Sequence, residues 1–177
     1  MVTMTKTYKV LLIGGKLIQD HEFFYPRYRV TEEDNFHLSI ATPQGAECQT
    51  NKGTVIKPDL SIEAANPDDF DALIIPGGAH AIEYVRQIKE LIDLTSAMNS
   101  QGKVIASICQ GSQILISAKV VKGRNVSGYY SIRDDIENAG GIYTDEKFVT
   151  DNNLVTTAHY KDLGPWMKEF VRLVNLS

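Results

Sequence analysis

The sequence has few cysteines, no long hydrophobic run and no excess of basic residues. Its 177 residues include only two cysteines, at unrelated positions, which excludes a disulfide framework. No apolar run reaches the roughly 18 residues of a membrane span. A net charge of −4 without a basic cluster argues against nucleic acid as the main partner. The first eight residues are polar and resemble no secretory signal. We therefore expect a cytoplasmic protein that binds neither membrane nor nucleic acid.

The glycine patterns of nucleotide-binding proteins are also missing. Gly14 and Gly15 follow an apolar run, but no GxGxxG pattern and no P-loop motif follows. The pair therefore indicates a tight connection between a strand and a helix. The remaining composition is ordinary, with 43% hydrophobic and 23% charged residues. This length suffices for one domain with a sizeable core, so we expect a single domain over residues 1–177.

Apolar patterns predict alternating strands and helices. Strands are expected at residues 9–13, 37–41, 71–75, 104–108 and 125–128, with a short hairpin or meander within 53–62 and a hairpin within 147–157. Helices are expected at residues 20–33, 81–98, 114–118, 131–139 and 162–176. The order predicts a doubly wound α/β fold, with a mostly parallel sheet and helices on both faces.

Cys109 stands where a predicted buried strand meets a predicted helix, two residues before Gly111. A nucleophile on such a turn is exposed above the sheet edge, and a helix N-terminus favours its thiolate and lowers its pKa. A buried core cysteine is the alternative. We take the second cysteine, Cys48, as an exposed bystander in a loop.

Two further features fall at the expected carboxyl edge of the sheet. Glu22 lies in the first turn of the helix after strand 9–13, which we expect to neighbour strand 104–108, so its carboxyl group can approach Cys109. Alternatively, Glu22 only complements the helix dipole. Gly77 and Gly78 end strand 71–75 and leave backbone N–H groups free for an oxyanion hole, or they form a plain turn. Asp20 is the expected cap of the Glu22 helix.

These motifs resemble the ThiJ/PfpI superfamily, which includes the Parkinson-disease protein and PfpI-type intracellular proteases. The matching segments are 20–22 with 25–26, 71–78, 106–111 with 113–118, and 123–135. The resemblance implies a flavodoxin-like fold of the class I glutamine amidotransferase type and a homodimer or larger homo-oligomer. It implies that Cys109 is the nucleophile, that Glu22 contacts it, and that Gly78 and Gln110 donate backbone N–H groups to an oxyanion.

The resemblance also indicates other positions around the thiol. Tyr129 matches a place where some members carry histidine and others tyrosine. His159 lies in a Thr-Thr-Ala-His-Tyr segment that is closer to a plant-type pattern of the superfamily than to a bacterial one. Glu83 lies near the place of a glutamate that a neighbouring subunit contributes in the proteases, shifted by one residue. No metal or organic cofactor is expected.

One departure bears on the reaction, because Gln110 replaces the histidine that most members carry after the cysteine. Glutamine cannot titrate, which counts against a Cys-His peptidase. A Cys109–Glu22 pair suits small reactive carbonyls instead, with conversion of methylglyoxal to lactate, as in glyoxalase III, as the concrete reaction in stress protection. An intracellular cysteine peptidase or amidase and a non-enzymatic redox sensor or chaperone that works through Cys109 oxidation are the alternatives.

Overall fold

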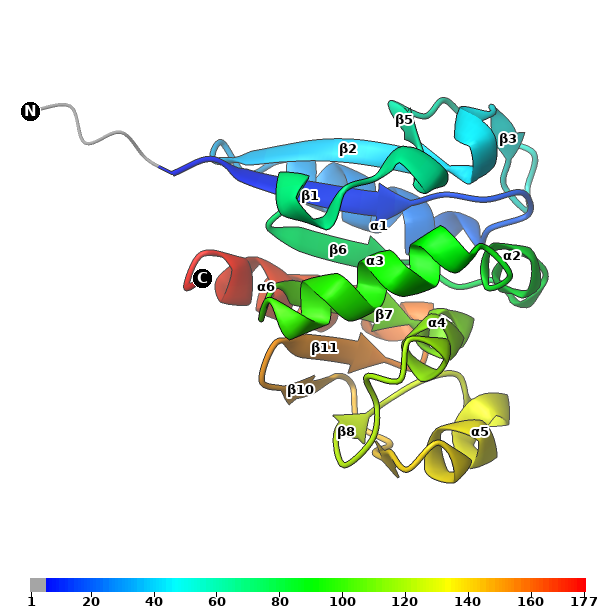
Figure 1. Ribbon diagram of the computed structural model, residues 1–177, viewed down its shortest axis with the longest axis vertical. Helices are drawn as coiled ribbons and strands as arrows, with labels where there is room; N and C mark the ends of the chain where they lie inside the picture. The colour runs from blue at the N-terminus through cyan, green and yellow to red at the C-terminus, as the bar shows by residue number, and fades with distance from the viewer. Residues whose placement is uncertain (1–5) are drawn as a thin grey trace, which may run out of the picture.

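The computed structural model describes residues 6–177, and a seven-stranded sheet forms its centre (Figure 1). In spatial order, the strands are β10 (Val149–Asp151), β11 (Leu154–Thr157), β7 (Val104–Ile108), β6 (Ala72–Ile75), β1 (Tyr8–Ile13), β2 (Phe36–Thr42) and β5 (Leu60–Ser61). β10 runs antiparallel to β11, whereas all the other neighbours are parallel. The predicted mostly parallel sheet is confirmed.

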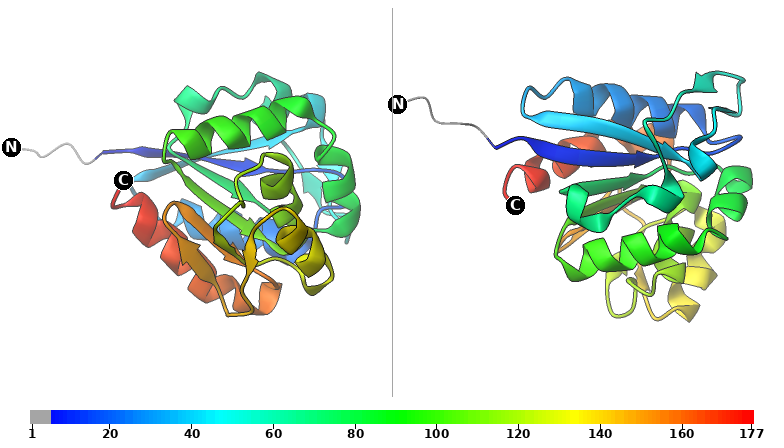
Figure 2. Two further views of the ribbon diagram at one scale, coloured as in Figure 1. Left: turned by 60° about the horizontal axis from the view of Figure 1, so that its bottom comes forward. Right: turned by 45° about the horizontal axis from the view of Figure 1, so that its top comes forward.

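Helices cover both faces of this sheet, as expected of a doubly wound fold (Figures 1 and 2). On one face lie α1 (Asp20–Thr31) and α6 (Leu163–Val174). On the other lie α2 (Ala79–Val85), α3 (Lys89–Ser100), α4 (Ser112–Ser117) and α5 (Arg133–Asn138). The right-hand view of Figure 2 shows α1 and α3 on opposite sides of the strands.

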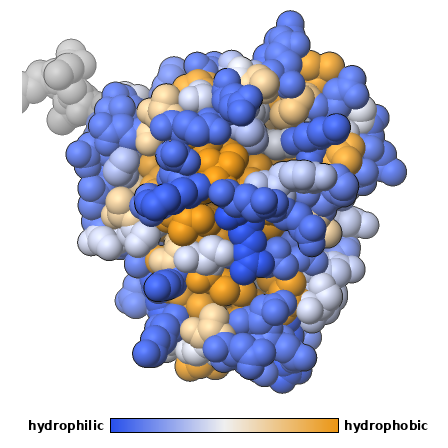
Figure 3. Space-filling view, turned by 45° about the vertical axis from the view of Figure 1, so that its right-hand side comes forward, coloured by the Kyte–Doolittle hydropathy of each residue, from blue (hydrophilic) through white to orange (hydrophobic). Residues whose placement is uncertain are grey.

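The central strands are buried on both faces, which explains their continuous apolar sequences. Every residue of β6 and β7 is buried. The strongly amphipathic α6 packs its apolar side on the sheet, and Trp166 on that side donates its indole N–H to the carbonyl oxygen of Val155 at 3.0 Å. The face of the molecule shown in Figure 3 carries mainly hydrophilic residues, with hydrophobic ones visible between them.

The order of the strands corrects one expectation. β1 and β7 are not neighbours, because β6 lies between them and pairs with both. Their carboxyl ends nevertheless meet at the same edge of the sheet, so the residues that follow β1, β6 and β7 converge there. The Gly77–Gly78 segment after β6 is therefore the centre of this edge.

The prediction of one long helix over residues 81–98 is wrong, because the structure has two helices there. α2 ends at Val85, and Ile88 has an extended backbone with φ −80° and ψ 106° before α3 begins. Ile88 packs against the apolar cluster on this side of the sheet. Packing of this side chain therefore overrides the continuous helical pattern, and no glycine or proline marks the break.

Residues 53–62 also pair differently from expectation. β4 (Val55–Ile56) pairs antiparallel with β3 (Cys48–Gln49), whereas β5 adds to the edge of the main sheet beside β2. The hairpin therefore begins at residue 48, and Cys48 is a half-buried strand residue rather than an exposed loop residue. A second small sheet joins β8 (Asn125–Val126) to β9 (Ile142–Tyr143).

The cap of α1 is Gln19 rather than Asp20. The Gln19 side chain accepts a hydrogen bond of 3.2 Å from the backbone N–H of Glu22. Asp20 instead accepts hydrogen bonds from the Thr50 hydroxyl at 2.5 Å and the Lys52 N–H at 3.0 Å. It thereby ties the helix start to the β3–β4 hairpin. Over residues 6–177, no helix is both long enough and apolar enough to cross a membrane.

Candidate active site

Cys109 begins the tight turn between β7 and α4. Its backbone is left-handed, with φ 60°, and the thiol-bearing residue is only 8% exposed. Gly111 permits the turn, because a Cβ at that position would lie 2.6 Å from the carbonyl oxygen of Ile75. The predicted sharp strand-to-helix turn is present, but a single 3₁₀ turn, Cys109–Gly111, precedes the short α4.

Glu22 reaches this turn from the first turn of α1. Its side chain is buried, with 1% exposure, and its carboxyl group hydrogen bonds to the Cys109 thiol. The carboxyl oxygen Oε2 has no well-aligned hydrogen-bond partner among the described residues. A buried oxygen in this condition favours the neutral, protonated carboxyl group. The structure therefore brings Glu22 and Cys109 together.

Gly77 lies against both reactive groups, and Gly78 follows it beside the β1–α1 connection. A Cβ on Gly77 would lie 2.3 Å from Glu22 Oε2 and 2.7 Å from the Cβ of Cys109, so only glycine fits. Gly78 has φ 106°, which also favours glycine. The backbone N–H groups of Gly78 and Gln110 both donate toward the Cys109 sulfur. Donors arranged in this way can also stabilise an oxyanion that forms next to the sulfur.

The pKa values of Glu22 and Cys109 differ from those expected for an activated thiolate. Burial raises the pKa of Glu22 to about 7, although its hydrogen bonds to Cys109 and the Gly77 N–H oppose this effect. Burial, and then the nearby Glu22 carboxylate, raise the pKa of Cys109 to about 12. The expected lowering of the Cys109 pKa by a helix N-terminus is therefore wrong, because burial and the neighbouring carboxylate outweigh the backbone donors.

Buried hydroxyl groups behind the turn connect it to the segment that carries Tyr129. Ser112 Oγ lies 2.8 Å from Ser107 Oγ and donates to the carbonyl oxygen of Ser127 at 2.8 Å. The Ser127 N–H donates to Thr156 Oγ1 at 2.8 Å. Two residues further on, the Tyr129 N–H donates to the Cys109 carbonyl oxygen at 3.0 Å. This network fixes the Tyr129 segment beside the thiol.

Comparison with known proteins establishes the family. The model of the DJ-1/PfpI family matches residues 8–173. The chain belongs to the DJ-1/PfpI family. This DJ-1/PfpI chain is 41% identical over 166 residues to "Deglycase PfpI" of Pyrococcus furiosus, covering 94% of this chain and 99% of that protein. It is 32% identical over 173 residues to "Protein/nucleic acid deglycase 2" of Escherichia coli, covering 97% and 99%.

The fold of solved DJ-1/PfpI structures agrees with this assignment. The DJ-1/ThiJ/PfpI-like and ferritin-like two-domain protein of Anabaena variabilis superposes with a TM-score of 0.90 at 27% identity. The match covers 94% of this chain and 48% of that longer chain. The resemblance predicted from the sequence motifs and the flavodoxin-like fold are both confirmed.

In this DJ-1/PfpI chain, the side chain of Gln110 has a structural contact and no acid or base group. It is 8% exposed, and its Nε2 donates to the Ser131 hydroxyl at 3.1 Å. The residue thus keeps its backbone N–H at the sulfur while its side chain braces the Tyr129–Ser131 segment. Tyr129 itself is half-buried against the apolar cluster that includes Cys109.

The two outlying candidates lie apart from the reacting pair. The ring of His159 lies 6.4 Å from that of Tyr129, and its Nδ1 accepts a hydrogen bond of 3.2 Å from the Lys161 N–H. Glu83 is exposed on α2, and its side chain makes no hydrogen bond or ion pair with the described residues. The structure therefore places His159 at the border of the site and Glu83 on the outer surface.

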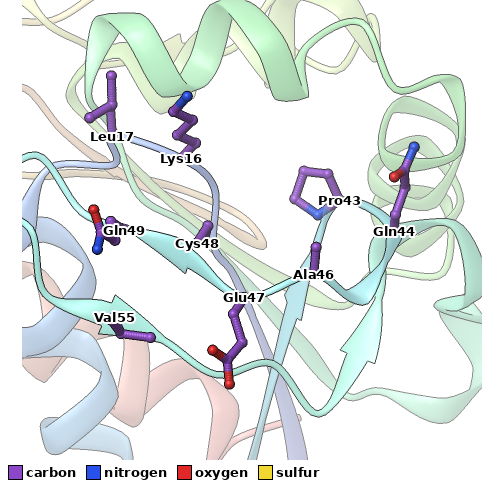
Figure 4. Close-up of a pocket in the computed structure, with 9 residues that line it drawn as sticks. All are labelled: Lys16, Leu17, Pro43, Gln44, Ala46, Glu47, Cys48, Gln49 and Val55. Atoms are coloured by element: carbon purple, nitrogen blue, oxygen red, sulfur yellow. The ribbon is translucent and has the colours of Figure 1, made fainter.

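A cavity of about 680 Å³ opens at the carboxyl ends of β1 and β2 (Figure 4). Its lining comes from the β1–α1 loop, the segment after β2 and the β3–β4 hairpin: Lys16, Leu17, Pro43, Gln44, Ala46, Glu47, Cys48, Gln49 and Val55. Neither Cys109 nor Glu22 lines it. Within residues 6–177, no group of three or more His, Cys, Asp or Glu side chains is arranged to hold a metal ion.

Sequence reasoning missed two kinds of residue at this site. The buried serine network leaves no signal in the sequence, because its partners lie on β7, α4 and the segment after β8. His21 and Tyr160 were also missed, although they lie next to residues with predicted roles. Their rings are 5.1 Å apart, across two segments that are distant in the chain. Adjacency to Glu22 and His159 was the available clue.

Proposed function

We propose that this chain is a cysteine-dependent enzyme that acts on reactive carbonyl compounds, free or as adducts with amines, in protection against carbonyl stress. Cys109 is the nucleophile and Glu22 the group that transfers protons. The observation that supports this role is the buried contact between the two side chains, with the N–H groups of Gly78 and Gln110 at the sulfur. The deglycase names of its relatives support the substrate class.

The reaction with methylglyoxal needs only these groups. The Cys109 thiolate adds to the aldehyde carbon and forms a C–S bond, while the oxyanion accepts hydrogen bonds from the Gly78 and Gln110 N–H groups. Glu22 then moves a proton from the former aldehyde carbon to the neighbouring carbon, which converts the hemithioacetal into a thioester. Water hydrolyses the thioester, releases lactate and returns the thiol. No organic cofactor or metal takes part in this scheme.

An amine adduct can enter the same sequence. In a hemiaminal, the sulfur forms a bond to the carbon while the C–N bond breaks, and protonated Glu22 donates its proton to the departing amine. The product is the same hemithioacetal. A Glu22 pKa of about 7 suits this step, because a substantial fraction of the carboxyl group still carries its proton at neutral pH.

A Cys-His peptidase is less compatible with the site. Such an enzyme uses a histidine beside the cysteine to activate the thiol and then to protonate the departing amide nitrogen. Gln110 has no titratable proton, and its side-chain amide is hydrogen-bonded to Ser131. We propose in addition that the chain self-associates, as the resemblance implies, and that Glu83 lies at the surface available to a second copy.

Turnover assays on purified variants test the proposed function. We expect the natural protein to form lactate from methylglyoxal, and Cys109→Ser and Glu22→Ala to abolish the reaction. Cys48→Ser is the matched control, because it removes the other cysteine, which lies in the separate cavity. Release of a fluorophore from a peptide amide is measured on the same samples. Cys109-dependent peptide cleavage together with unchanged methylglyoxal would contradict the proposal.

A further inference from the structure

Five aromatic side chains form a continuous row beside the reactive pair. We call these residues the aromatic row: His21, Tyr160, His159, Tyr129 and Tyr130. Their successive ring centroids lie 5.1, 4.0, 6.4 and 5.5 Å apart. The members come from α1, from the segment before α6 and from the segment after β8, so the row forms only in the folded protein.

The aromatic row adjoins the reacting pair through Tyr129, which packs against the cluster that includes Cys109. At one end, His21 precedes Glu22 in the chain. Near the other end, the Tyr129 N–H donates to the Cys109 carbonyl oxygen at 3.0 Å. Tyr129 therefore places one part of the row beside the Cys109 turn, and the rings of His159 and Tyr160 continue outward from it.

The rings differ in their availability. Tyr130 is 44% exposed, but the ammonium group of Lys161 lies 5.9 Å from its ring centre, so a second cation is disfavoured there. Tyr160 is 42% exposed and has histidine rings as its aromatic neighbours on both sides. The Tyr160 ring is therefore partly accessible, and among the described residues no ammonium group lies over it.

Such a face distinguishes the amine parts of carbonyl adducts. The guanidino unit of a hemiaminal adduct remains planar and conjugated, and such a unit stacks on aromatic rings. The side chain of a lysine adduct is flexible and has no π-system. The two kinds of adduct present the same carbon to Cys109, so the row is the part of the surface that can tell them apart.

We infer that the aromatic row, and Tyr160 in particular, makes this chain select adducts on planar guanidino groups over adducts on aliphatic amines. This inference rests on the proposed function and refines its substrate class. Tyr160 is a specificity-determining residue in this scheme, and the chemical step stays with Cys109 and Glu22. Free methylglyoxal has no amine part, so its turnover is independent of Tyr160.

The test compares methylglyoxal adducts of N-acetylarginine and N-acetyllysine as substrates. We expect Tyr160→Leu to lower kcat/KM for the arginine adduct by about fivefold or more, through KM, because a stacking contact is lost. The value for the lysine adduct and the turnover of free methylglyoxal stay the same. Tyr160→Phe keeps the π-face and retains the preference. Tyr84→Leu is the matched control, because Tyr84 pairs with His80 at 5.1 Å and 54°, as Tyr160 pairs with His21 at 5.1 Å and 55°.

The outcomes separate this inference from the proposed function. The inference is overturned if Tyr160→Leu lowers kcat/KM equally for both adducts. It is also overturned if the arginine adduct disappears at a rate independent of enzyme concentration. In both cases, turnover of methylglyoxal by the natural protein still supports the proposed function. If the natural protein turns over neither methylglyoxal nor the adducts, the function fails. Calorimetric binding of the arginine adduct to Cys109→Ser protein, with and without Tyr160→Leu, then decides the inference: weaker binding in the double variant supports it, and equal or undetectable binding in both overturns it.

Discussion

The carboxyl group of Glu22 and the thiol of Cys109 are joined by a hydrogen bond in a buried site, where burial raises both pKa values and the Glu22 carboxylate raises that of Cys109 further. With pKa values of about 7 and about 12, the two groups together hold a single proton across that range. In this one-proton state, the tautomer with a thiolate and a neutral carboxyl group is the nucleophilic form. The pair is therefore best treated as one titrating unit.

The raised pKa of Glu22 predicts how stability depends on pH. A pKa raised from 4.5 to about 7 means that the folded protein holds this proton more tightly than the unfolded chain. The contribution of this proton to the free energy of unfolding is complete below about pH 4.5 and is lost as pH rises to about 7 and beyond. Its size is roughly 3 kcal/mol, at about 1.4 kcal/mol per pH unit.

Glu22→Gln should therefore stabilise the protein at pH 8 but not at pH 4, because the amide keeps a hydrogen-bond donor and never ionises. The measurement is the free energy of unfolding from urea titrations at both pH values. Asp20→Asn on the same helix turn serves as a control, since Asp20 hydrogen bonds at the surface of the hairpin. An equal effect of Glu22→Gln at both pH values would show that folding does not raise the pKa of Glu22.

The same pair predicts the pH dependence of alkylation at Cys109. The one-proton state appears as pH rises through about 7, so the iodoacetamide reaction should rise with a midpoint near 7. In Glu22→Gln, the thiol ionises alone in a buried site, and the midpoint should move to more alkaline pH. Mass spectrometry of the Cys109 and Cys48 peptides measures both rates. An unchanged midpoint in the variant would refute the shared proton.

Gly77 predicts a steric limit on the pair. Gly77→Ala places a Cβ 2.3 Å from Glu22 Oε2, so the carboxyl group must move away from the thiol. A displacement of this size should lower kcat by about 100-fold. Gly164→Ala in α6 is the control, because its new Cβ has only the Tyr25 hydroxyl within 4 Å, at 3.8 Å, and alanine favours helix. Equal activity of the two variants would show that the pair tolerates separation.

Gln110 predicts which chemistry survives its replacement. Gln110→His should change methylglyoxal turnover by less than about threefold, because the backbone N–H at the sulfur is kept. A general acid that took part in the step would contribute about 100-fold or more. Lactate formation measures the effect. Gln110→Ala is the companion variant, since it also removes the hydrogen bond to Ser131. A large gain with histidine alone would indicate that the side chain enters the reaction.

Patterns that repeat along the chain predicted most of the fold. Continuous apolar runs located β1, β6 and β7, and the stripe that includes Trp166 located α6, because burial on both faces of a sheet or along one helix face constrains the local sequence. The break between α2 and α3 was not predictable in this way. It depends on where Ile88 packs in the folded protein, and the local pattern continues through it.

For the candidate site, the sequence predicted where the residues lie better than it predicted their chemical properties. The turn at Cys109 and the position of Glu22 followed from strand ends and the family resemblance. The pKa of the thiol did not, since it depends on burial and on a carboxyl group that is 87 positions away in the chain. The neighbour relation of β1 and β7 was also wrong, because strand order is set by long connections that carry no local signal.

Because the backbone of Cys109 is left-handed, a substitution at this position can abolish activity without lowering the amount of folded protein. A side chain at φ 60° carries a strain of about 1 kcal/mol or more that glycine does not have. A Cys109→Gly variant should therefore fold, resist heat at least as well and accumulate normally while it lacks the thiol. Genetic screens that score expression or solubility would pass such a variant as harmless, so inactivating changes at this position are detectable only by an assay of the chemistry.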